Sequence, residues 1–321
     1  MADIHSLLVI PNLYIQNANA ISGPMTWGFP SMSAFVGLMH ALERRLPDSL
    51  ELLFDGVGVV CHGYEAQATD GFTRAFHLTR NPVDKKGATA AIVEEGRIHL
   101  EISLIFAVRW VEEVEPRELW PKIAAEIDDL IAGMRIAGGS VMPSRKRKVP
   151  RLISLADDSE QRDREFQKLK YQLLPGFALI QRDDLLQSHL TDMQLSKPDS
   201  TVLDAWLDLS RLNVECRLVE EQGSDGEVVT SPLWEVRRPR GWIVPIPAGY
   251  AAISDLLPPG SVANARDTKI PFHFVESLYS VGQWLSPHRL QVPQDLIWSV
   301  ESDPDQGMYR LVNNNHLQTE R

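Results

Sequence analysis

Cysteine is scarce in this chain of 321 residues, which contains only Cys61 and Cys216. Neither belongs to a Cys-x-x-Cys pair, which argues against a thiolate zinc site and against a disulfide framework. The two isolated cysteines therefore predict a reducing compartment and two buried thiols.

Long apolar runs and common enzyme signatures are also missing. No stretch approaches the ~20 apolar residues of a membrane span. The apolar run at 6–10 lacks the basic flank and the small-residue cleavage site of a signal peptide. Phosphate-binding loops, His-Glu-x-x-His and Gly-x-Ser-x-Gly motifs do not occur. We therefore expect a cytoplasmic protein with no membrane partner, no metal and no cofactor.

Positive charge is in deficit, because 32 Lys and Arg stand against 43 Asp and Glu, which gives a net charge of -11. That balance argues against a general nucleic-acid binder, since such proteins usually carry a basic surface. The deficit is uneven, however. Residues 144–170 carry +4, whereas 1–143 carry -7 and 171–321 carry -8. The basic charge is thus concentrated in one segment, which begins with the run 145–151.

What the chain does contain is ample apolar material, at 44% of residues, which excludes global disorder. Apolar periodicity predicts strands at 6–16, 51–66, 98–106 and 176–180, with a bend or bulge at Gly56–Gly58. It also predicts helices from about 31 to 46 and from 117 to 137, the second ending at a flexible glycine loop at 138–140. Turn residues between 72 and 97 predict an extended hairpin. This order is typical of a ferredoxin-like α+β domain.

Beyond residue 183 the pattern is more helical, with helices expected at 183–196, 201–212 and 272–285. Residues 220–231 are expected to form an exposed loop, and the proline-rich segment 239–259 an irregular packed segment. These features predict a first domain over 1–182, with a hairpin near 72–97 and a basic insertion at 144–170. A helical and irregular region over 183–321 would pack on it.

Candidate chemistry is sparse in the sequence. His40, His62 and His77 could act as general acid or base, but lone histidines on helices and strands are more often structural. Cys61 and His62 form no dyad, because neighbours on a strand point to opposite faces.

Candidate RNA-binding residues cluster around 17–29. Aromatic side chains stack on unpaired bases, and amides read base edges, which favours Trp27 and Phe29 together with Asn17 and Asn19. The alternative is that these loop aromatics fold back onto the core. Later in the chain, Arg266 and Arg289 lie among polar groups near turns, where arginine suits phosphate or carboxylate binding.

Long strings of this sequence resemble the second Csy subunit of type I-F CRISPR surveillance complexes, a member of the Cas-five branch of the RAMP proteins. They cover nearly the whole chain, except for the basic run 145–151 and the acidic stretch 220–231. The strings are IQNANAISGPMTWGFPS (15–31), DGVGVVCH (55–62), LTRNP (78–82), TAAIVEEGR (89–97), MRIAGGS (134–140), LPGFAL (174–179), VPIPAGY (244–250), NARD (264–267) and WLSPHR (284–289).

The resemblance implies a ferredoxin-like (RRM-like) palm with a β-hairpin thumb and a glycine-rich loop at 138–139. It implies a non-catalytic subunit that holds the five-prime handle of the crRNA and pairs with the large Csy subunit at the complex tail. Cas-seven-type backbone subunits would be further partners, and target double-stranded DNA an indirect one or one reached through basic loops. The expected RNA-binding residues are Asn17, Asn19, Trp27, Phe29, Arg80, Lys85, Lys86, Arg135, Ser140, Arg266, His288 and Arg289.

Two alternatives remain open on the sequence alone. One is a metal-independent endoribonuclease that processes precursor crRNA, with His40, His62 and Tyr64 as candidates for its general base. The other is a purely structural tail subunit whose partners hold the RNA.

Overall fold

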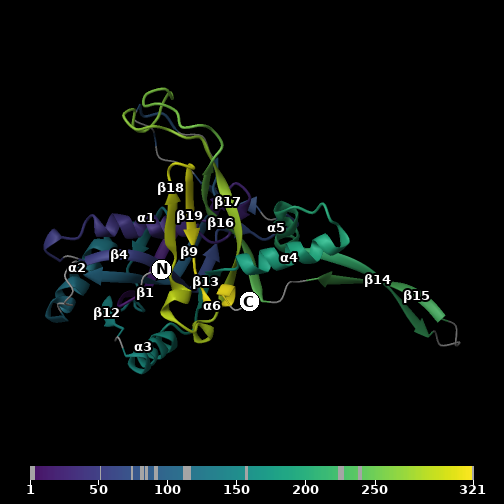
Figure 1. Ribbon diagram of the computed structural model, residues 1–321, viewed down its shortest axis with the longest axis horizontal. Coiled ribbons are helices and arrows are strands. Elements are labelled where there is room, and N and C mark those ends of the chain that lie inside the picture. Colours follow the sequence, from purple (N-terminus) through teal and green to yellow (C-terminus); the bar gives the residue numbers. More distant parts are fainter. Residues whose placement is uncertain are drawn as a thin grey trace.

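The fold is built on one large, curled antiparallel sheet with helices on both faces (Figure 1). The computed structural model describes residues 4–50, 52–73, 75–79, 83, 86–89, 93–110, 117–155, 158–222, 228–237 and 241–319. Six α-helices lie within these residues. The chain is thus a mixed α and β protein, which agrees with the expected α+β class.

The large sheet contains eleven strands in the described part of the chain, and every pairing in it is antiparallel. Its three longest strands, β1, β9 and β4, lie side by side. β12 (Arg151–Ser154) also pairs with β1. The order along the sheet is β10 (Arg135–Ile136), β11 (Gly139–Met142), β1 (Ser6–Asn19), β9 (Arg97–Trp110), β4 (Leu52–Ala66), β13 (Phe177–Gln181), β17 (Val275–Leu285), β16 (Trp242–Ala252), β19 (Met308–Val312) and β18 (Ser299–Asp303).

Alternation along β1 divides the core between the two sheet faces. Leu8 and Ile10 pack with α1 (Met32–Glu43) and α2 (Trp120–Ala132). Leu7 and Val9 pack on the opposite face with α3 (Ser159–Gln172). Because successive side chains of a strand point to opposite faces, this one segment contributes to both layers of core.

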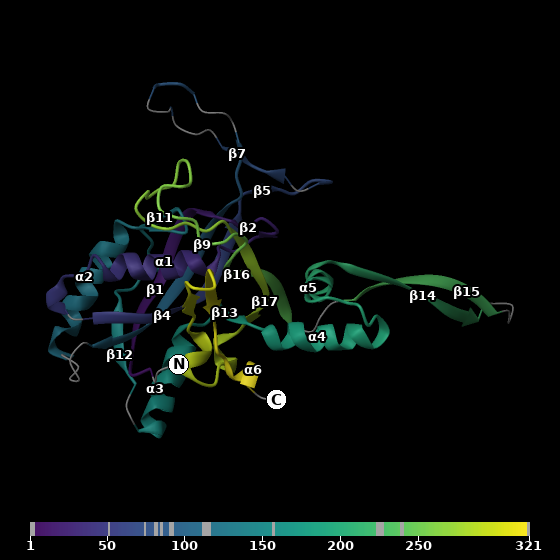
Figure 2. The ribbon, with the colours of Figure 1, turned by 45° about the horizontal axis from the view of Figure 1, so that its top comes forward.

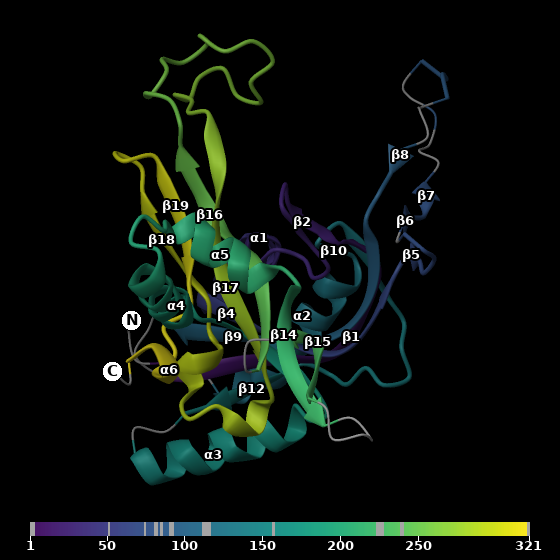
Figure 3. The same cartoon turned by 90° about the vertical axis from the view of Figure 1, so that its right-hand side faces the viewer.

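Smaller elements decorate the sheet. In Figures 2 and 3, the segment between β4 and β9 projects from the body, as do residues 253–274 between β16 and β17, on the same side. α4 and α5 pack together near β16 and β17. The remaining strands are β2 (Ile21–Gly23), β3 (Thr26–Trp27), β5 (Ala68–Thr69), β6 (Ala75–Phe76), β7 (Leu78–Thr79), β8 (Val93–Glu94), β14 (Asn213–Gln222) and β15 (Val228–Arg237). The remaining helical elements are η1 (Asp48–Leu50), η2 (Arg117–Leu119), α4 (Asp183–Ser196), α5 (Val202–Ser210), η3 (Pro287–Arg289), η4 (Pro293–Leu296) and α6 (His316–Thr319).

Many of the predicted elements are confirmed. The helix expected at 183–196 is α4, and a capping box between Thr201 and Asp204 begins α5 within the expected 201–212. The bulge expected at Gly56–Gly58 is present as a register shift between Phe54 and Gly56. Within the described residues, no helix has both the length and the apolar character that a membrane crossing requires.

The helix expected at 272–285 is wrong, because this segment holds strand β17. β17 pairs with β13 on one side and with β16 on the other. A strand covered on both faces loses its two-residue alternation, so its apolar spacing imitated a helix.

The irregular segment expected at 239–259 is also wrong, because Trp242–Ala252 form strand β16. Pro245 and Pro247 share one edge of this strand, since the direction of the peptide N–H alternates along it. β19 pairs with β16 only from Gly249 onward, so neither proline interrupts that ladder.

Three further expectations need correction. α2 ends at Ala132, and residues 135–142 form the hairpin of β10 and β11 instead of a helix end and a flexible loop. The expected loop 220–231 includes the paired ends of β14 and β15, while 223–227 lie outside the described residues. Cys61 is half-buried, but Cys216 on β14 is exposed, so only one thiol is shielded.

A buried polar network joins β13 to the last part of the chain. Asn313 and Gln181 exchange hydrogen bonds between each backbone N–H and the other's side-chain oxygen, at 2.9 and 3.1 Å. The Asn313 side chain also donates to the carbonyls of Asp295 and Ile297. All four hydrogen bonds lie in the interior, where a lost partner leaves an unsatisfied polar group.

We therefore expect Asn313→Ala to lower the free energy of unfolding by about 3 kcal/mol, because it leaves several buried donors and acceptors without partners at once. The neighbouring Asn314 is exposed and provides a matched control, Asn314→Ala. Urea denaturation of both variants measures the difference. Equal midpoints for the two variants would show that the network contributes little.

Candidate nucleic-acid interface

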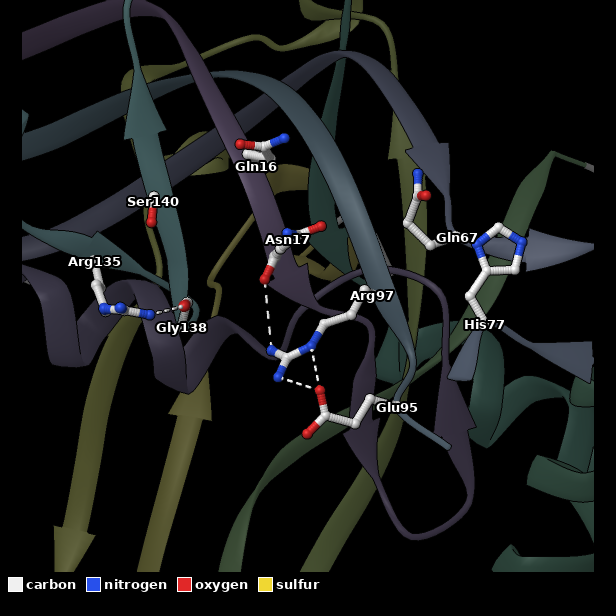
Figure 4. Close-up of a pocket in the computed structure, with 9 residues that line it drawn as sticks. All are labelled: Gln16, Asn17, Gln67, His77, Glu95, Arg97, Arg135, Gly138 and Ser140. Atoms are coloured by element: carbon white, nitrogen blue, oxygen red, sulfur yellow. Dashed lines mark hydrogen bonds and ion pairs between the residues drawn. The ribbon is translucent and has the colours of Figure 1, made fainter. Parts of the chain in front are cut away.

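Three of the predicted contacts, Asn17, Arg135 and Ser140, line a groove of about 350 Å³ near the tip of the β10–β11 hairpin (Figure 4). We call it the hairpin groove. It is lined by Gln16, Asn17, Gln67, His77, Glu95, Arg97, Arg135, Gly138 and Ser140. These residues come from four segments: β1, the base of the segment between β4 and β9 (which we call the projection), the start of β9, and the hairpin.

The hairpin turn that carries the site is set by two residues with left-handed backbone. Ala137 and Gly138 have φ of 49° and 78°, and they join the pairs Arg135–Ser140 and Ile136–Gly139. Positive φ at both central residues is the type I′ geometry that suits the twist of a hairpin. The turn therefore points Arg135 and Ser140 in a fixed direction.

Close packing fixes the hairpin against β1. A Cβ added to Gly139 would lie 2.7 Å from Cγ2 of Ile15, and 2.8 Å from backbone atoms of Ala18 and Gln16. Only glycine fits there without moving one of the strands. The close approach brings Ser140 into register with Gln16, so Arg135, Ser140 and Gln16 form a polar row across three strands.

The polar row lies on the sheet face opposite α1 and α2. Ile15 and Ile136 belong to the core that contains these helices. Their neighbours Gln16 and Arg135 are exposed and point the other way, since side chains alternate along a strand.

A bulge in β1 presents Asn17 to the hairpin groove. The pairing of β1 with β9 shifts between Ile15 and Ala18, and Asn17 has φ of 58°. Its backbone N–H donates to Nδ1 of His99 at 3.1 Å, so a side chain on β9 holds the bulge. Asparagine tolerates this left-handed conformation better than most residues, which explains its presence here.

The charges in the hairpin groove are modest. Arg97 donates through Nε to Glu95 at 2.9 Å, so its guanidinium is partly neutralised (Figure 4). Arg135 donates to the carbonyl of Gly138 at 3.1 Å, which steadies its exposed guanidinium. Three amide side chains, from Gln16, Asn17 and Gln67, complete the lining. Amides that can pair with base edges, next to one or two arginines that can pair with phosphates, suit a short single strand.

A second groove of about 410 Å³ continues from the first around the hairpin tip, and both are lined by Arg135 and Gly138. We call it the helix groove, since α1 forms much of it. Its α1 wall includes the small residues Ala34, Gly37 and Ala41, while Tyr250 from β16 contributes an aromatic ring. The two grooves together form one polar surface that passes over the hairpin.

Asn19 lines the helix groove, but its side chain is already engaged. Its amide donates to the Ile21 carbonyl at 2.7 Å, and its oxygen accepts from the Ile21 N–H at 3.1 Å. This closes the chain from β1 onto β2, so Asn19 shapes the site through the backbone.

The two candidate aromatics have different environments. Trp27 is 40% exposed and lies against Phe76 of the projection, with ring centroids 5.7 Å apart. Phe29 packs against Phe35 and Trp284 beside the main core. Trp27 therefore keeps a surface for stacking at the base of the projection, whereas Phe29 has the packing environment of a structural residue.

The remaining candidates are spread over the molecule. Arg80 and Lys85 lie outside the described residues, and Lys86 is exposed within the projection. Arg266 is exposed in the segment 253–274, which projects on the same side (Figure 3).

His288 and Arg289 are exposed in η3, which contacts α3 instead of the hairpin. The Ser286 hydroxyl lies 2.8 Å from Nδ1 of His288. The structure thus gathers Asn17, Asn19, Arg135 and Ser140 at one place, with Trp27 nearby, and it leaves these two apart.

Sequence reasoning missed several residues that line the hairpin groove. Gln16, Gln67, Glu95 and Arg97 were not among the expected contacts, although Gln16 and Arg97 lie in strings that carry the resemblance. Gln16 follows Ile15 in a buried strand, and its place in the site follows from its pairing with Ser140 of the unpredicted hairpin.

His62, one of the candidates for catalysis, is engaged in a structural role. Both ring nitrogens of His62 are hydrogen-bonded at 2.7 Å, one to the Pro175 carbonyl and the other to the Ser103 hydroxyl. Burial is the main cause that raises the pKa of the Cys61 thiol to about 11, so it stays protonated near neutral pH. Among the described residues, no group of three or more His, Cys, Asp or Glu side chains is arranged to hold a metal ion.

Comparison with known proteins supplies a family. The family model described as CRISPR-associated protein (Cas_Csy2) matches residues 8–311. A protein named CRISPR-associated protein Csy2, from Pseudomonas aeruginosa (strain UCBPP-PA14), is 46% identical over 321 residues. That alignment covers 97% of this chain and 96% of the relative. The resemblance drawn from the sequence strings is therefore confirmed.

The two hairpin glycines make separable predictions. Gly138→Ala meets no atom within 4 Å and suffers only its left-handed φ, so we expect a loss of about 1 kcal/mol of stability. Gly139→Ala forces its Cβ onto the β1 backbone, and we expect a loss of about 3 kcal/mol. Chemical denaturation of both variants measures the two losses. A larger loss at Gly138 would refute the role assigned to close packing.

Proposed function

The chain belongs to the Csy2 family of CRISPR-associated proteins, and from this premise we propose that it is a non-catalytic, RNA-binding subunit of a type I-F CRISPR surveillance complex. Its ligand in this proposal is the five-prime handle of the crRNA. A handle is a short single strand of fixed sequence, and such a strand is held by stacking and base-edge hydrogen bonds more than by net charge.

The observation that carries the RNA half of the proposal is the continuous surface formed by the hairpin and helix grooves. It combines amide side chains with Arg97 and Arg135, and exposed Trp27 lies beside the projection. A single strand laid across the hairpin tip would meet amides on one side and Tyr250 on the other.

The sheet order supports the finer proposal of a ferredoxin-like palm. β11, β1, β9 and β4 are adjacent in that order, α1 follows β1, and α2 follows β9. A β-α-β-β-α-β unit with its fourth strand beside the first has this arrangement. The projection between β4 and β9 occupies the place of the proposed thumb.

The partners follow from the same proposal. They are the large Csy subunit, with which this chain would form a heterodimer at the complex tail, and the Cas-seven-type backbone subunits. The division of the chain at residue 182 and the location in the cytoplasm also stay predictions.

Contact of the basic run 145–151 with target double-stranded DNA is less favoured by the structure. Arg147 pairs with Asp128, Lys146 lies 3.0 Å from Glu101, and Arg151 donates to Gln172. Much of the charge in this run is therefore committed to neighbouring elements, and less of it is available to phosphates.

Arg135→Ala tests the RNA site. We expect it to weaken binding of a labelled handle RNA by about tenfold, because it removes one charged hydrogen-bond donor from the surface. Fluorescence anisotropy on the heterodimer with the large subunit, at one fixed salt concentration, measures the affinity.

The matched control for this measurement is Arg164→Ala. Arg164 is exposed on α3 and pairs with Glu160. α3 packs near the start of β1, around Leu7 and Val9, whereas the hairpin groove lies near the end of that strand. If both variants bound the handle as tightly as the unaltered protein, the hairpin groove would not be the RNA site.

The second candidate function is the endoribonuclease, which needs a base near a ribose 2′-hydroxyl. Since both nitrogens of His62 are occupied, we expect labelled repeat RNA to stay intact when incubated with the purified chain. A discrete cut, abolished by His62→Ala or by His40→Ala, would establish the enzyme instead.

The third candidate is a tail subunit that does not touch the RNA. Ultraviolet crosslinking of the assembled complex separates it from our proposal. Crosslinks from the handle to the segments around Asn17 and Ser140 would support the grooves, and their absence would favour the structural role.

A further inference from the structure

An arm made of β14 and β15 projects from the body beyond α4 and α5 (Figures 1 and 2). Ten residue pairs join the two strands, from Asn213–Arg237 to Gln222–Val228. The arm forms a sheet of its own, separate from the large sheet. A two-stranded hairpin standing alone is marginally stable in water, so such an arm requires support from packing.

The two faces of the arm differ sharply in chemistry. Every second residue of each strand, near the root of the arm, is apolar and points to the same side. We call this side the apolar face. Trp234 is 66% exposed, Leu218 72% and Val214 50%. The members of this face are Val214, Cys216, Leu218, Pro232, Trp234 and Val236.

The opposite face is polar and internally paired. Arg237 lies 2.8 Å from Glu215, and Arg217 lies 3.6 Å from Glu235. Each ion pair crosses between the two strands, so this face is suited to solvent. Alternation of this kind is the pattern of a sheet with one solvated and one covered face.

The root of the arm is firmly anchored. Asp208 of α5 accepts from Arg237, Arg211 and His189 at 2.7–2.8 Å. Its burial alone would raise the pKa of Asp208, but these hydrogen bonds outweigh that effect and lower the pKa to about 2. Asn213 adds a hydrogen bond to the Asp208 carbonyl. The hydrogen-bonded cluster around Asp208 thus holds the base of the arm in place.

From these observations we propose that the apolar face of the arm docks into an apolar groove of a different protein, one bordered by basic side chains. Exposed apolar patches of this kind commonly mark protein interaction sites. Trp234 is the central anchor, because large aromatic side chains dominate the energy of such interfaces.

Charge identifies the occupant. Residues 213–237 contain six carboxylates and two arginines, so the arm carries -4. A second copy of this chain would oppose like charge, both on the arm and through its total of -11. Nucleic acid is disfavoured as well, since phosphates would meet an acidic arm whose apolar face offers no cation. A groove with apolar walls would complement the apolar face, and basic side chains around it would complement the negative charge of the arm.

The test rests on the assembly half of the proposed function, since it uses the complex formed by co-expression with the other protein subunits and crRNA. Hydrogen–deuterium exchange compares the arm amides of the unaltered chain, free and in the complex. We expect at least tenfold slower exchange in the complex over 213–222 and 228–237. Unchanged exchange there would overturn the proposal.

Two adjacent substitutions separate the faces. Trp234→Ser removes the anchor, whereas Leu233→Ser alters the neighbouring residue on the polar face, which is 46% exposed. We expect the Trp234 variant to weaken retention of one protein subunit by at least tenfold on size-exclusion chromatography, and the Leu233 variant to retain it. Equal retention by both variants would overturn the proposal.

The other possible partners of the apolar face, a second copy of the chain and RNA, would give different results in these experiments. Self-association of the isolated chain that Trp234→Ser abolishes would assign the face to a second copy, and loss of RNA affinity in that variant would assign it to RNA. Either result refutes a protein partner. A complex that protects the arm but contains no crRNA would refute the proposed function and leave the docking face standing.

Discussion

The exchange of hydrogen bonds between Gln181 and Asn313 joins β13 to the last part of the chain, which in turn meets β4 through the bridge between Trp298 and Val57. β13 reaches β4 through only two residue pairs, at Phe177–Cys61 and Ala178–Val60, which is a short seam for so large a sheet. The buried network around Asn313 adds bonds that the strand pairing cannot supply. Tyr250 of the C-terminal part lines the helix groove, so the shape of that groove depends on this joint.

Glycines on β4 complete the same joint. A Cβ on Gly56 would lie 2.6 Å from the Trp298 carbonyl, and one on Gly58 would lie 2.6 Å from the Leu296 carbonyl. The bend predicted there from sequence is present, but its reason is the close approach of a segment about 240 residues later in the chain. Local patterns located the feature, and only the tertiary structure explains it.

Prediction from sequence succeeded for the long elements around the sheet centre and failed for β17 and for the short hairpin 135–142. The helix at 183–196 has an exposed face, and its bounds were predicted exactly as they occur in α4. Residues 280–283 of β17 are buried on both faces of the sheet, so the apolar spacing there lost the period that identifies a strand. The hairpin 135–142 was missed because its two strands are short and depend on the close contact of Gly139 with β1. The grooves could not be predicted for the same reason. Arg97 and Gln16 line one groove only because β1 and β9 pair with a bulge at Asn17.

Electrostatics assigns different tasks to different parts of an acidic chain. The most basic segment is tied to its neighbours through Arg147 and Lys146, so overall charge says little about where RNA would bind. The hairpin groove instead offers amides and two arginines, an arrangement whose affinity comes from shape and base edges and which tolerates a negative net charge. The arm projects in another direction and carries the opposite chemistry, a carboxylate-rich hairpin with one apolar face (Figure 2). An acidic surface repels free nucleic acid everywhere except at such a groove. In the proposed function, the same charge that weakens general RNA binding would favour the hairpin groove as the RNA site and basic proteins as partners.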